Sequence, residues 1–330
     1  MRPRGWYIGW VGKENLGDEA LFEACRERFP DVAWQVHLPD GPPPMPSVAT
    51  FARRATSARQ LAQTVAHEFR SWERSRRIAE AARERSQSAL AAVPTAVRRR
   101  FAGQCGILGG GTLLNHATFL RAYREVRERV GRPMPVFGCG VANPGFWPGR
   151  RSGWVDQRRE WRDALAELPV VGVRGPLSRD LLLAAGIAQT EMVGDAAILL
   201  YEPETAPRPR RAPGEAPLIG FNCGCATGAM WGSYESFLPR MIESVRRLLA
   251  KGYRVELVSV WPEDDPACEA VMAAVRGAGE VSIAPTFTSS HEEFMSHVRR
   301  YDSFVALKLH AGILAAAATV PFVMLEYRPK

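Results

Sequence analysis

The sequence predicts an α/β protein with two Rossmann-like domains that face each other across a cleft, an arrangement of the GT-B type. Apolar, strand-like runs alternate with helical patterns along most of the chain, which is typical of parallel sheets covered by helices on both faces. A stretch rich in proline and arginine, residues 203–217, interrupts this alternation as a linker. The 330 residues suffice for two hydrophobic cores. We therefore expect an N-terminal domain at residues 1–202 and a C-terminal domain at residues 218–330.

The N-terminal half opens with a strand, a glycine-bearing loop and a helix, which together start a βαβ unit. The strand is predicted at residues 6–11, and the helix begins after Asn15 and stops at Pro30. Further strands are predicted at residues 32–38, 106–108, 136–138, 170–173 and 191–193, and helices at residues 117–130, 155–168 and 176–185. Each helix thus links two strands that run in the same direction.

The C-terminal half repeats the alternation after the linker. Strands are predicted at residues 218–222, 254–261, 303–306 and 322–325, and helices at residues 234–250, 267–275, 292–299 and 310–318. Ligands of open parallel sheets bind outside the carboxyl ends of the strands. The strand-to-helix loops are therefore the places where we expect functional residues.

Residues 50–100 predict a basic helical insertion in the N-terminal domain. Between residues 53 and 100 the chain has twelve arginines, four glutamates and no aspartate, which accounts for the net charge of +8. On a helix, Arg70, Arg74 and Arg77 share one face, which predicts reversible contact with anionic membranes. The alternative is a solvated basic face. Motifs of nucleic-acid-binding modules are absent from the sequence, so a nucleic-acid partner is not expected.

Several classes of protein and ligand are disfavoured by the sequence. Its longest apolar runs, such as residues 311–320, are shorter than a membrane span, and its N-terminus lacks a secretory signal, so we expect a cytoplasmic protein. The six cysteines are scattered and expected to be reduced, and the pair Cys223 and Cys225 lacks the neighbours of a zinc site. Neither a dinucleotide fingerprint nor a P-loop is present. We expect no metal and no redox cofactor.

The loops at the strand ends carry the residues suited to proton transfer and anion binding. Asp18 follows Gly17 at the first strand-to-helix turn, where its carboxylate can contact a sugar hydroxyl or transfer a proton, whereas helix capping equally explains Glu19. Gly110 and Gly111 allow a phosphate or sugar to approach the backbone closely, and His116 follows them.

Four further residues are expected near the cleft between the domains. Arg174 and Asp195 each follow a predicted strand, and the alternative reading of Arg174 is an ion pair with Asp195 that involves no substrate. Lys308 and His310 end one strand and begin a helix, which places a cation and an imidazole at a helix N-terminus. Imidazole is suited to acid and base catalysis near neutral pH.

With these residues in place, the chain resembles the polysaccharide pyruvyl transferase family over nearly all of its length. Five blocks in the same order carry the resemblance: NLGDEA at residues 15–20, GGGTLL at 109–114, GVRGPLS at 172–178, VGDA at 193–196, and KLHA at 308–311 continuing to YRPK at 327–330. The resemblance implies a GT-B-like fold. It also implies transfer of a pyruvyl group from phosphoenolpyruvate to two hydroxyls of a sugar, which gives a ketal.

The resemblance also implies roles for individual residues. Lys308 and His310 match the family's Arg-Leu-His signature, so Lys308 would bind the donor and His310 would be catalytic, with Asp18 or His116 orienting the acceptor. An arginine guanidinium can form two parallel hydrogen bonds to a carboxylate or phosphate, whereas a lysine ammonium is a point charge. Lysine at this position can therefore change the affinity for the donor or the identity of the donor. Further substrate-binding residues are expected at Arg174, Asn15, Gly17, Glu19, Gly110, Gly111, Thr112, Ser178, Asp195 and Asn222.

Two other departures from the family concern the C-terminal domain. Many members carry an arginine in its first strand, where this chain has Asn222 and its neighbours. Members usually continue beyond the YRPK block, so we expect a closing C-terminal helix to be absent.

The expected partners are phosphoenolpyruvate and a saccharide acceptor, linked to a lipid diphosphate, from a cell-envelope or exopolysaccharide precursor. Two alternatives remain open. One is a GT-B glycosyltransferase that uses a nucleotide sugar, and the other is a glycan-binding relative without catalytic activity. The sequence does not distinguish which sugar would accept the group.

Overall fold

The computed structural model describes residues 3–12, 14–37, 104–146, 157–201, 211–224, 230, 233–288 and 290–328. The expected basic insertion at residues 50–100, with Arg70, Arg74 and Arg77, lies outside the described residues, as does most of the expected linker. The predictions made for these segments, including membrane contact, stay predictions.

The N-terminal domain is built on a parallel sheet of seven strands in the order β2-β1-β3-β5-β6-β7, with β4 paired to β5. The strands are β1 (Arg4–Ile8), β2 (Ala33–His37), β3 (Cys105–Gly109), β4 (Thr112–Leu114), β5 (Val136–Val141), β6 (Val171–Val173) and β7 (Thr190–Met192). One face packs against α5 (Ala117–Val130), α6 (Arg158–Leu165) and α7 (Pro176–Ala184), and the other against α1 (Leu16–Arg28). Both faces are covered, as the alternation predicts.

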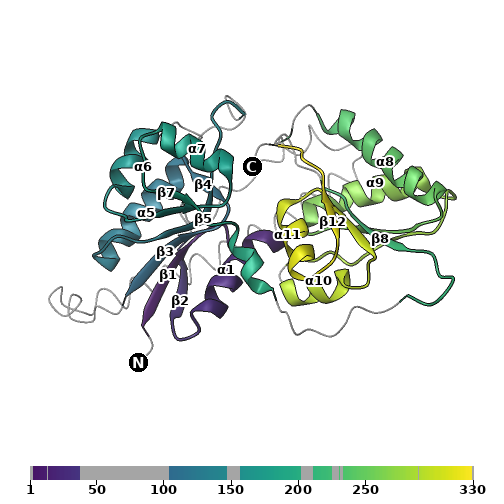
Figure 1. The fold of residues 1–330 in the computed structure, drawn as a ribbon, viewed down its shortest axis with the longest axis horizontal. Helices are drawn as coiled ribbons and strands as arrows, with labels where there is room; N and C mark the ends of the chain where they lie inside the picture. Colours follow the sequence, from purple (N-terminus) through teal and green to yellow (C-terminus); the bar gives the residue numbers. More distant parts are fainter. Residues whose placement is uncertain are drawn as a thin grey trace, which may run out of the picture.

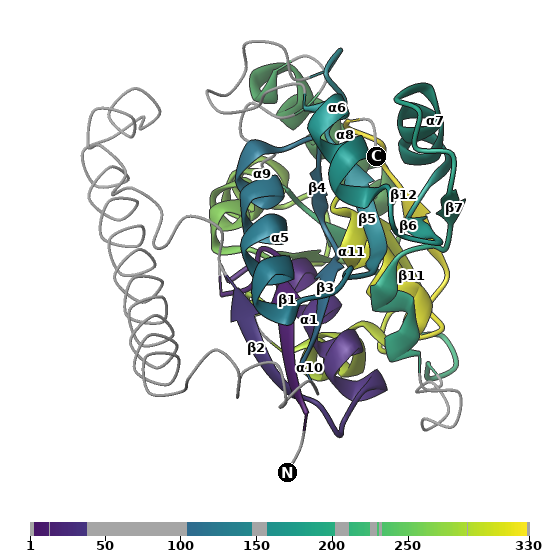
Figure 2. The ribbon, with the colours of Figure 1, turned by 90° about the vertical axis from the view of Figure 1, so that its left-hand side faces the viewer.

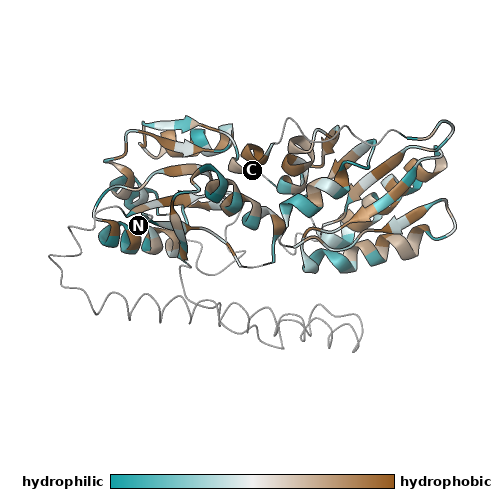
Figure 3. Cartoon of the chain, turned by 90° about the horizontal axis from the view of Figure 1, so that it is seen from below, coloured by the Kyte–Doolittle hydropathy of each residue, from teal (hydrophilic) through white to brown (hydrophobic). Residues whose placement is uncertain are grey.

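The C-terminal domain has a second parallel sheet, of five strands, in the order β10-β9-β8-β11-β12. The strands are β8 (Leu218–Asn222), β9 (Arg254–Val258), β10 (Val281–Ile283), β11 (Ser303–Ala306) and β12 (Phe322–Met324). Its outer face packs against α8 (Tyr234–Ala250) and α9 (Asp265–Val275), and its inner face against α10 (His291–Val298) and α11 (Leu309–Ala317). Figure 3 shows hydrophobic residues running through the strands of both domains and hydrophilic residues on much of the helices.

The predicted fold class is confirmed, and several predicted elements have the observed bounds, among them α5, α8, β8 and β11. The ends of the helices have local causes: Gly131 ends α5 with a left-handed φ of 72°, and Ser233 caps α8 reciprocally with Ser236. The sequence analysis missed β4, β10 and the 3-10 helix η1 (Ala196–Leu200) because each is too short to show a period. β1 ends before the expected residue 11, which places Trp10 in a loop.

The two domains meet through one continuous hydrophobic core rather than through the linker alone. Leu16, Leu21 and Ala24 of α1 share this core with η1 and with residues of α10, α11 and the C-terminal strands. Figures 1 and 2 both show α1 against α10 and α11 where the domains join. The backbone N–H of Leu16 also donates to the carbonyl oxygen of Val260, at 3.2 Å, which ties the start of α1 to the loop after β9.

Among the helices of the described residues, none has both the length and the hydrophobicity that crossing a bilayer requires.

Removing side-chain volume from the shared core should destabilise the protein. Leu16 is 1% exposed, so the Leu16→Ala variant should lose about 2–5 kcal/mol of unfolding free energy, from lost burial and the cavity left behind. Urea titration followed by circular dichroism measures this loss. Leu199, which is 44% exposed, provides the matched control, since Leu199→Ala should change stability by less than about 0.5 kcal/mol. Equal midpoints for the two variants would contradict the shared core.

Candidate functional site

The candidate site lies where the first turn of α1 meets the first turn of α11. Asn15 caps α1, and its side-chain oxygen accepts from the backbone N–H of Gly17 at 3.1 Å. A Cβ placed on Gly17 would overlap the Nδ1 atom of His310, so only glycine allows the two helices to approach this closely. The blocks at residues 15–20 and 308–311 therefore come together, although almost the whole chain separates them.

His310 contacts a buried carboxylate of the other domain. Its Nε2 atom lies 3.3 Å from Oδ2 of Asp195, and the same oxygen lies 3.9 Å from Nη1 of Arg174. The side chains of Arg174, Asp195 and His310 are 6%, 9% and 14% exposed. Arg174 also donates through Nη2 to Oγ1 of Thr112, at 2.7 Å. The ion pair between Arg174 and Asp195, which was the alternative interpretation of Arg174, is present. His310 adds a contact to this pair from the C-terminal domain.

The charges of this group stabilise one another. Burial alone would raise the pKa of Asp195, but the contact with His310, together with the charge of Arg174 and the backbone N–H of Ala197, lowers it to about 2. Burial lowers the pKa of Arg174, and Asp195 opposes this effect. Asp195 is therefore a carboxylate at neutral pH, and it can hold the imidazole of His310 in one orientation.

Arg174 retains a buried donor that the protein does not use. Among the described residues, its Nε atom has no hydrogen-bond partner. A buried polar group without a partner costs about 1–3 kcal/mol, which a bound anion would relieve. The geometry thus favours an anionic ligand beside Arg174.

Lys308, at the same helix N-terminus, is paired within its own domain. Its Nζ atom lies 3.2 Å from Oδ1 of the fully buried Asp264 and 4.7 Å from the ring centroid of Trp261. Burial would lower the pKa of Lys308, but the carboxylate of Asp264 outweighs it and the pKa is raised. Lys308 therefore stays charged, with its ammonium group held between a carboxylate and an aromatic ring.

Asn222 differs from its expected role in substrate binding. Its side chain is completely buried, and Oδ1 accepts from the backbone N–H groups of Leu307 and Lys308, at 3.2 and 2.8 Å. Its Nδ2 atom donates to the carbonyl of Val258, at 3.0 Å. Asn222 therefore joins the ends of β8, β9 and β11 and fixes the backbone from which Lys308 projects.

Glu19 and Ser178 each accept a hydrogen bond from a backbone N–H group. Oε1 of Glu19 accepts from the backbone N–H of Gly12 at 2.6 Å and holds the loop between β1 and α1. The hydroxyl of Ser178 is buried and accepts from the backbone N–H of Val141 at 3.1 Å. Both side chains thus stabilise the backbone of a neighbouring segment.

The remaining predicted residues lie around the carboxyl ends of β1, β3 and β4. Gly110 and Gly111 have positive φ values of 70° and 65°, and a Cβ on Gly111 would lie 3.6 Å from Oδ1 of Asp18. His116 is buried, and its Nδ1 atom lies 2.7 Å from Oγ1 of Thr118. Asp18 thus lies beside the glycine turn, as its position in the sequence implies.

Three residues of this region were missed by the sequence analysis: Trp261, Asp264 and Arg328. Trp261 and Asp264 lie in the segment after β9. The available signal in the sequence was therefore an aromatic residue and a carboxylate shortly after a strand. Besides burial, the positive charge of Arg328 acts to lower the pKa of both Arg174 and Lys308. Arg328 therefore adds positive charge near both Arg174 and Lys308.

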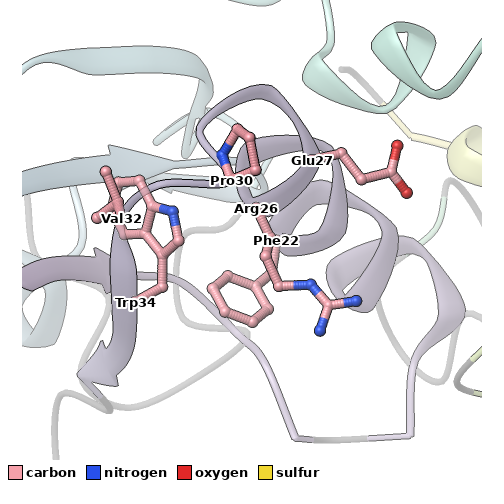
Figure 4. A pocket seen from close by; sticks show the side chains of 6 residues that line it. All are labelled: Phe22, Arg26, Glu27, Pro30, Val32 and Trp34. Carbon is pink, nitrogen blue, oxygen red and sulfur yellow. The ribbon is translucent and has the colours of Figure 1, made fainter. Parts of the chain in front are cut away.

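Two other features of the described residues lie apart from this group. A pocket of about 530 Å³ on α1 and β2 is lined by Phe22, Arg26, Glu27, Pro30, Val32 and Trp34 (Figure 4). Glu27, His291 and Glu292 have potential metal-ligating atoms within 4.8 Å of one another. Because Nε2 of His291 lies 3.3 Å from Oε1 of Glu27, we interpret this cluster as an ion pair between α1 and α10. The pocket includes no predicted site residue and lies away from the strand ends where ligands of this fold bind.

A family model described as polysaccharide pyruvyl transferase matches residues 15–329. A search of curated protein sequences finds no significant match.

Similar solved structures include the UDP-GlcNAc 2-epimerase of Methanocaldococcus jannaschii in complex with UDP-GlcNAc and UDP. It has 8% identity and a TM-score of 0.50, with coverage of 99% of this chain and 85% of that chain. The UDP-GlcNAc 2-epimerase of Neisseria meningitidis has 8% identity and a TM-score of 0.47, and the match covers 98% of this chain and 82% of that chain. A heptosyltransferase of Escherichia coli has 11% identity and a TM-score of 0.38, with coverage of 97% and 88%. At these identities the similarity concerns the fold alone, which is of the GT-B type.

The low pKa of Asp195 predicts a pH-dependent contribution to stability. A carboxylate whose pKa falls from 3.8 to about 2 on folding stabilises the folded state above pH 3.8, and the contribution is lost as the pH falls through about 2. The Asp195→Asn variant should therefore be less stable than the unaltered protein by about 2 kcal/mol at pH 6, and by much less near pH 2.

Urea titration at a series of pH values measures this difference. Since the pKa of Glu256 is also lowered to about 2, only the difference between the two proteins isolates Asp195. Asp163, an exposed carboxylate 3.6 Å from Arg162, provides the control, because Asp163→Asn should cost less than about 1 kcal/mol. A stability difference for Asp195→Asn that is the same at pH 6 and pH 2 would contradict the assignment.

Proposed function

The chain belongs to the polysaccharide pyruvyl transferase family, and on this premise we propose that it forms a pyruvyl ketal on a sugar, with phosphoenolpyruvate as the donor. The acceptor in this proposal is a cell-envelope or exopolysaccharide precursor carried on a lipid diphosphate. The observation that carries the proposal is the buried group of Arg174, Asp195 and His310, which pairs an oriented imidazole with an unused cationic donor.

The reaction requires proton transfer and stabilisation of negative charge. A proton adds to the methylene carbon of phosphoenolpyruvate, and the oxygen of a first sugar hydroxyl bonds to the adjacent carbon. The bond from that carbon to the phosphate oxygen breaks, its electron pair leaves with the phosphate, and the oxygen of the second hydroxyl takes its place. The two hydroxyls release two protons, of which one replaces the proton given to the methylene carbon and the other leaves with the phosphate.

His310 is suited to the proton transfers. Its imidazole contacts the carboxylate of Asp195 through Nε2, and a carboxylate in this position orients a histidine and stabilises its protonated form. The two residues come from different domains, so the pair forms only when α1, η1 and α11 are packed together. In this proposal Asp18 and His116 orient the acceptor hydroxyls.

Arg174 and Lys308 are suited to binding the donor. Phosphoenolpyruvate carries a carboxylate and a phosphate, and buried cations bind such groups strongly because the surroundings exclude water. Arg174 offers the unused Nε donor, and the N-terminus of α11 offers partial positive charge beside Lys308. The proposed reaction uses no metal and no redox cofactor.

The proposal is tested by following phosphate release. Incubation with phosphoenolpyruvate and a panel of envelope saccharides should release phosphate, and His310→Ala should lower kcat about 10²-fold to 10⁴-fold. His297→Ala is the matched control, because His297 pairs with Glu256 on the C-terminal domain, at 2.8 Å, and should leave kcat unchanged.

Two results would contradict the assignment. One is the absence of phosphate release with every acceptor, and the other is turnover that survives in His310→Ala. If a nucleotide sugar raises the melting temperature while phosphoenolpyruvate does not, the glycosyltransferase alternative is favoured instead.

The role of Arg174 predicts a selective effect on donor binding. Arg174→Lys keeps the charge but loses the Nε donor and the fork of the guanidinium, so KM for phosphoenolpyruvate should rise about tenfold or more. Initial rates at saturating acceptor measure this change. Arg179→Lys is the control, because Arg179 is exposed, pairs with Asp180 and lies on α7 just beyond Arg174. An unchanged KM in Arg174→Lys would exclude Arg174 from donor binding.

A further inference from the structure

Trp10 stands exposed on the loop at the carboxyl end of β1. It is 37% exposed, whereas Trp6 and Trp161 of the same domain are buried. A large aromatic side chain gains free energy by burial, and ligands of open parallel sheets bind at the carboxyl ends of strands. An exposed tryptophan at this position is therefore well placed to contact a ligand.

The surroundings of Trp10 hold its ring in a fixed place. The ring centroid lies 5.0 Å from that of the fully buried Phe119, at 71°, and 6.3 Å from that of His116, at 83°. The loop is itself fastened, because Gly12 donates to Glu19 at 2.6 Å. A ring that is already ordered loses little conformational entropy when a ligand stacks on it.

The polar groups near the ring indicate what kind of ligand fits. His116 adds an imidazole beside the ring, with Nδ1 2.7 Å from the hydroxyl of Thr118. Asp18 and Glu19 occupy the first turn of α1, which follows the same loop. Carboxylates accept hydrogen bonds from sugar hydroxyls, whereas they repel phosphates. An aromatic ring beside an imidazole, on a loop that leads into a helix turn with two carboxylates, suits the apolar face and hydroxyl edge of a sugar better than a nucleotide.

We propose that Trp10 is a stacking platform for a sugar ring of the acceptor. This inference rests on the proposed function, because that function identifies the saccharide as the acceptor of the reaction. Stacking fixes one ring of the acceptor against the N-terminal domain. The donor-binding cations follow other strands, since Arg174 comes after β6 and Lys308 after β11.

The first test measures saccharide binding without the donor. Saturation-transfer NMR with neutral methyl glycosides of glucose, galactose, mannose and N-acetylglucosamine should detect binding to the unaltered protein. Trp10→Leu should weaken the binding of the best glycoside about tenfold, and Trp10→Phe should retain it within about threefold, because phenylalanine keeps an aromatic face. Trp34→Leu is the matched control, since Trp34 lies in the pocket on α1 and β2. Circular dichroism verifies that each variant is folded.

The outcomes separate this inference from the proposed function. Phosphate release with an unchanged acceptor KM in Trp10→Leu overturns the platform and leaves the function standing. Glycoside binding that depends on Trp10, without phosphate release from any acceptor, supports the platform and contradicts the function. Absence of glycoside binding to the unaltered protein overturns the platform. The platform is also overturned if UMP binding is lost in Trp10→Leu while glycosides bind all variants equally. The ring would then stack on a nucleobase and not on a sugar.

Discussion

The close packing of α1 on α11 is the constraint on which the rest of the structure depends. Gly17 leaves no side chain between the two helices, and the ring of His310 fills the space that a Cβ would occupy. Leu16 and Ala20, beside it, continue into the core that both domains share. Because this core is apolar and continuous, separating the domains would expose it to water. The arrangement of the two sheets, and the contact of His310 with Asp195, follow from this packing.

Two buried carboxylates hold the side chains of Lys308 and His310 at the start of α11. Asp195 of the N-terminal domain holds His310, and Asp264 of the C-terminal domain holds Lys308. Burying such charges costs free energy that pairing only partly returns, so pairs of this kind are weak evidence for stability. Their benefit is to fix two side chains, two residues apart in the sequence, in defined positions. The compact ammonium of Lys308 also fits between Asp264 and Trp261, which gives a local reason for a lysine at this position.

Local patterns predicted the elements of this fold well, but not the contacts between distant ones. The alternation of strands and helices follows from periods within a few residues, which a sequence displays directly. The strand-end position of Arg174, Asp195 and His310 followed from the same patterns, and these three side chains do come together. The role of Asn222 could not be predicted, because its partners are backbone groups of β9 and of the loop after β11. Asp264 was missed because its partner lies far along the chain.

The strand order separates the proposed substrates in space. β1, which precedes Trp10, and β6, which precedes Arg174, are three steps apart across β3 and β5, or about 14 Å at the usual strand spacing. His310 lies between them, since it contacts Gly17 at the start of α1 and Asp195 after β7. A donor at Arg174 and a reacting sugar at His310 therefore leave Trp10 beneath a ring farther along the acceptor. On the proposed mechanism, the protein acts on a saccharide of more than one ring, because a single sugar can occupy either the stacking position at Trp10 or the reacting position at His310, but not both.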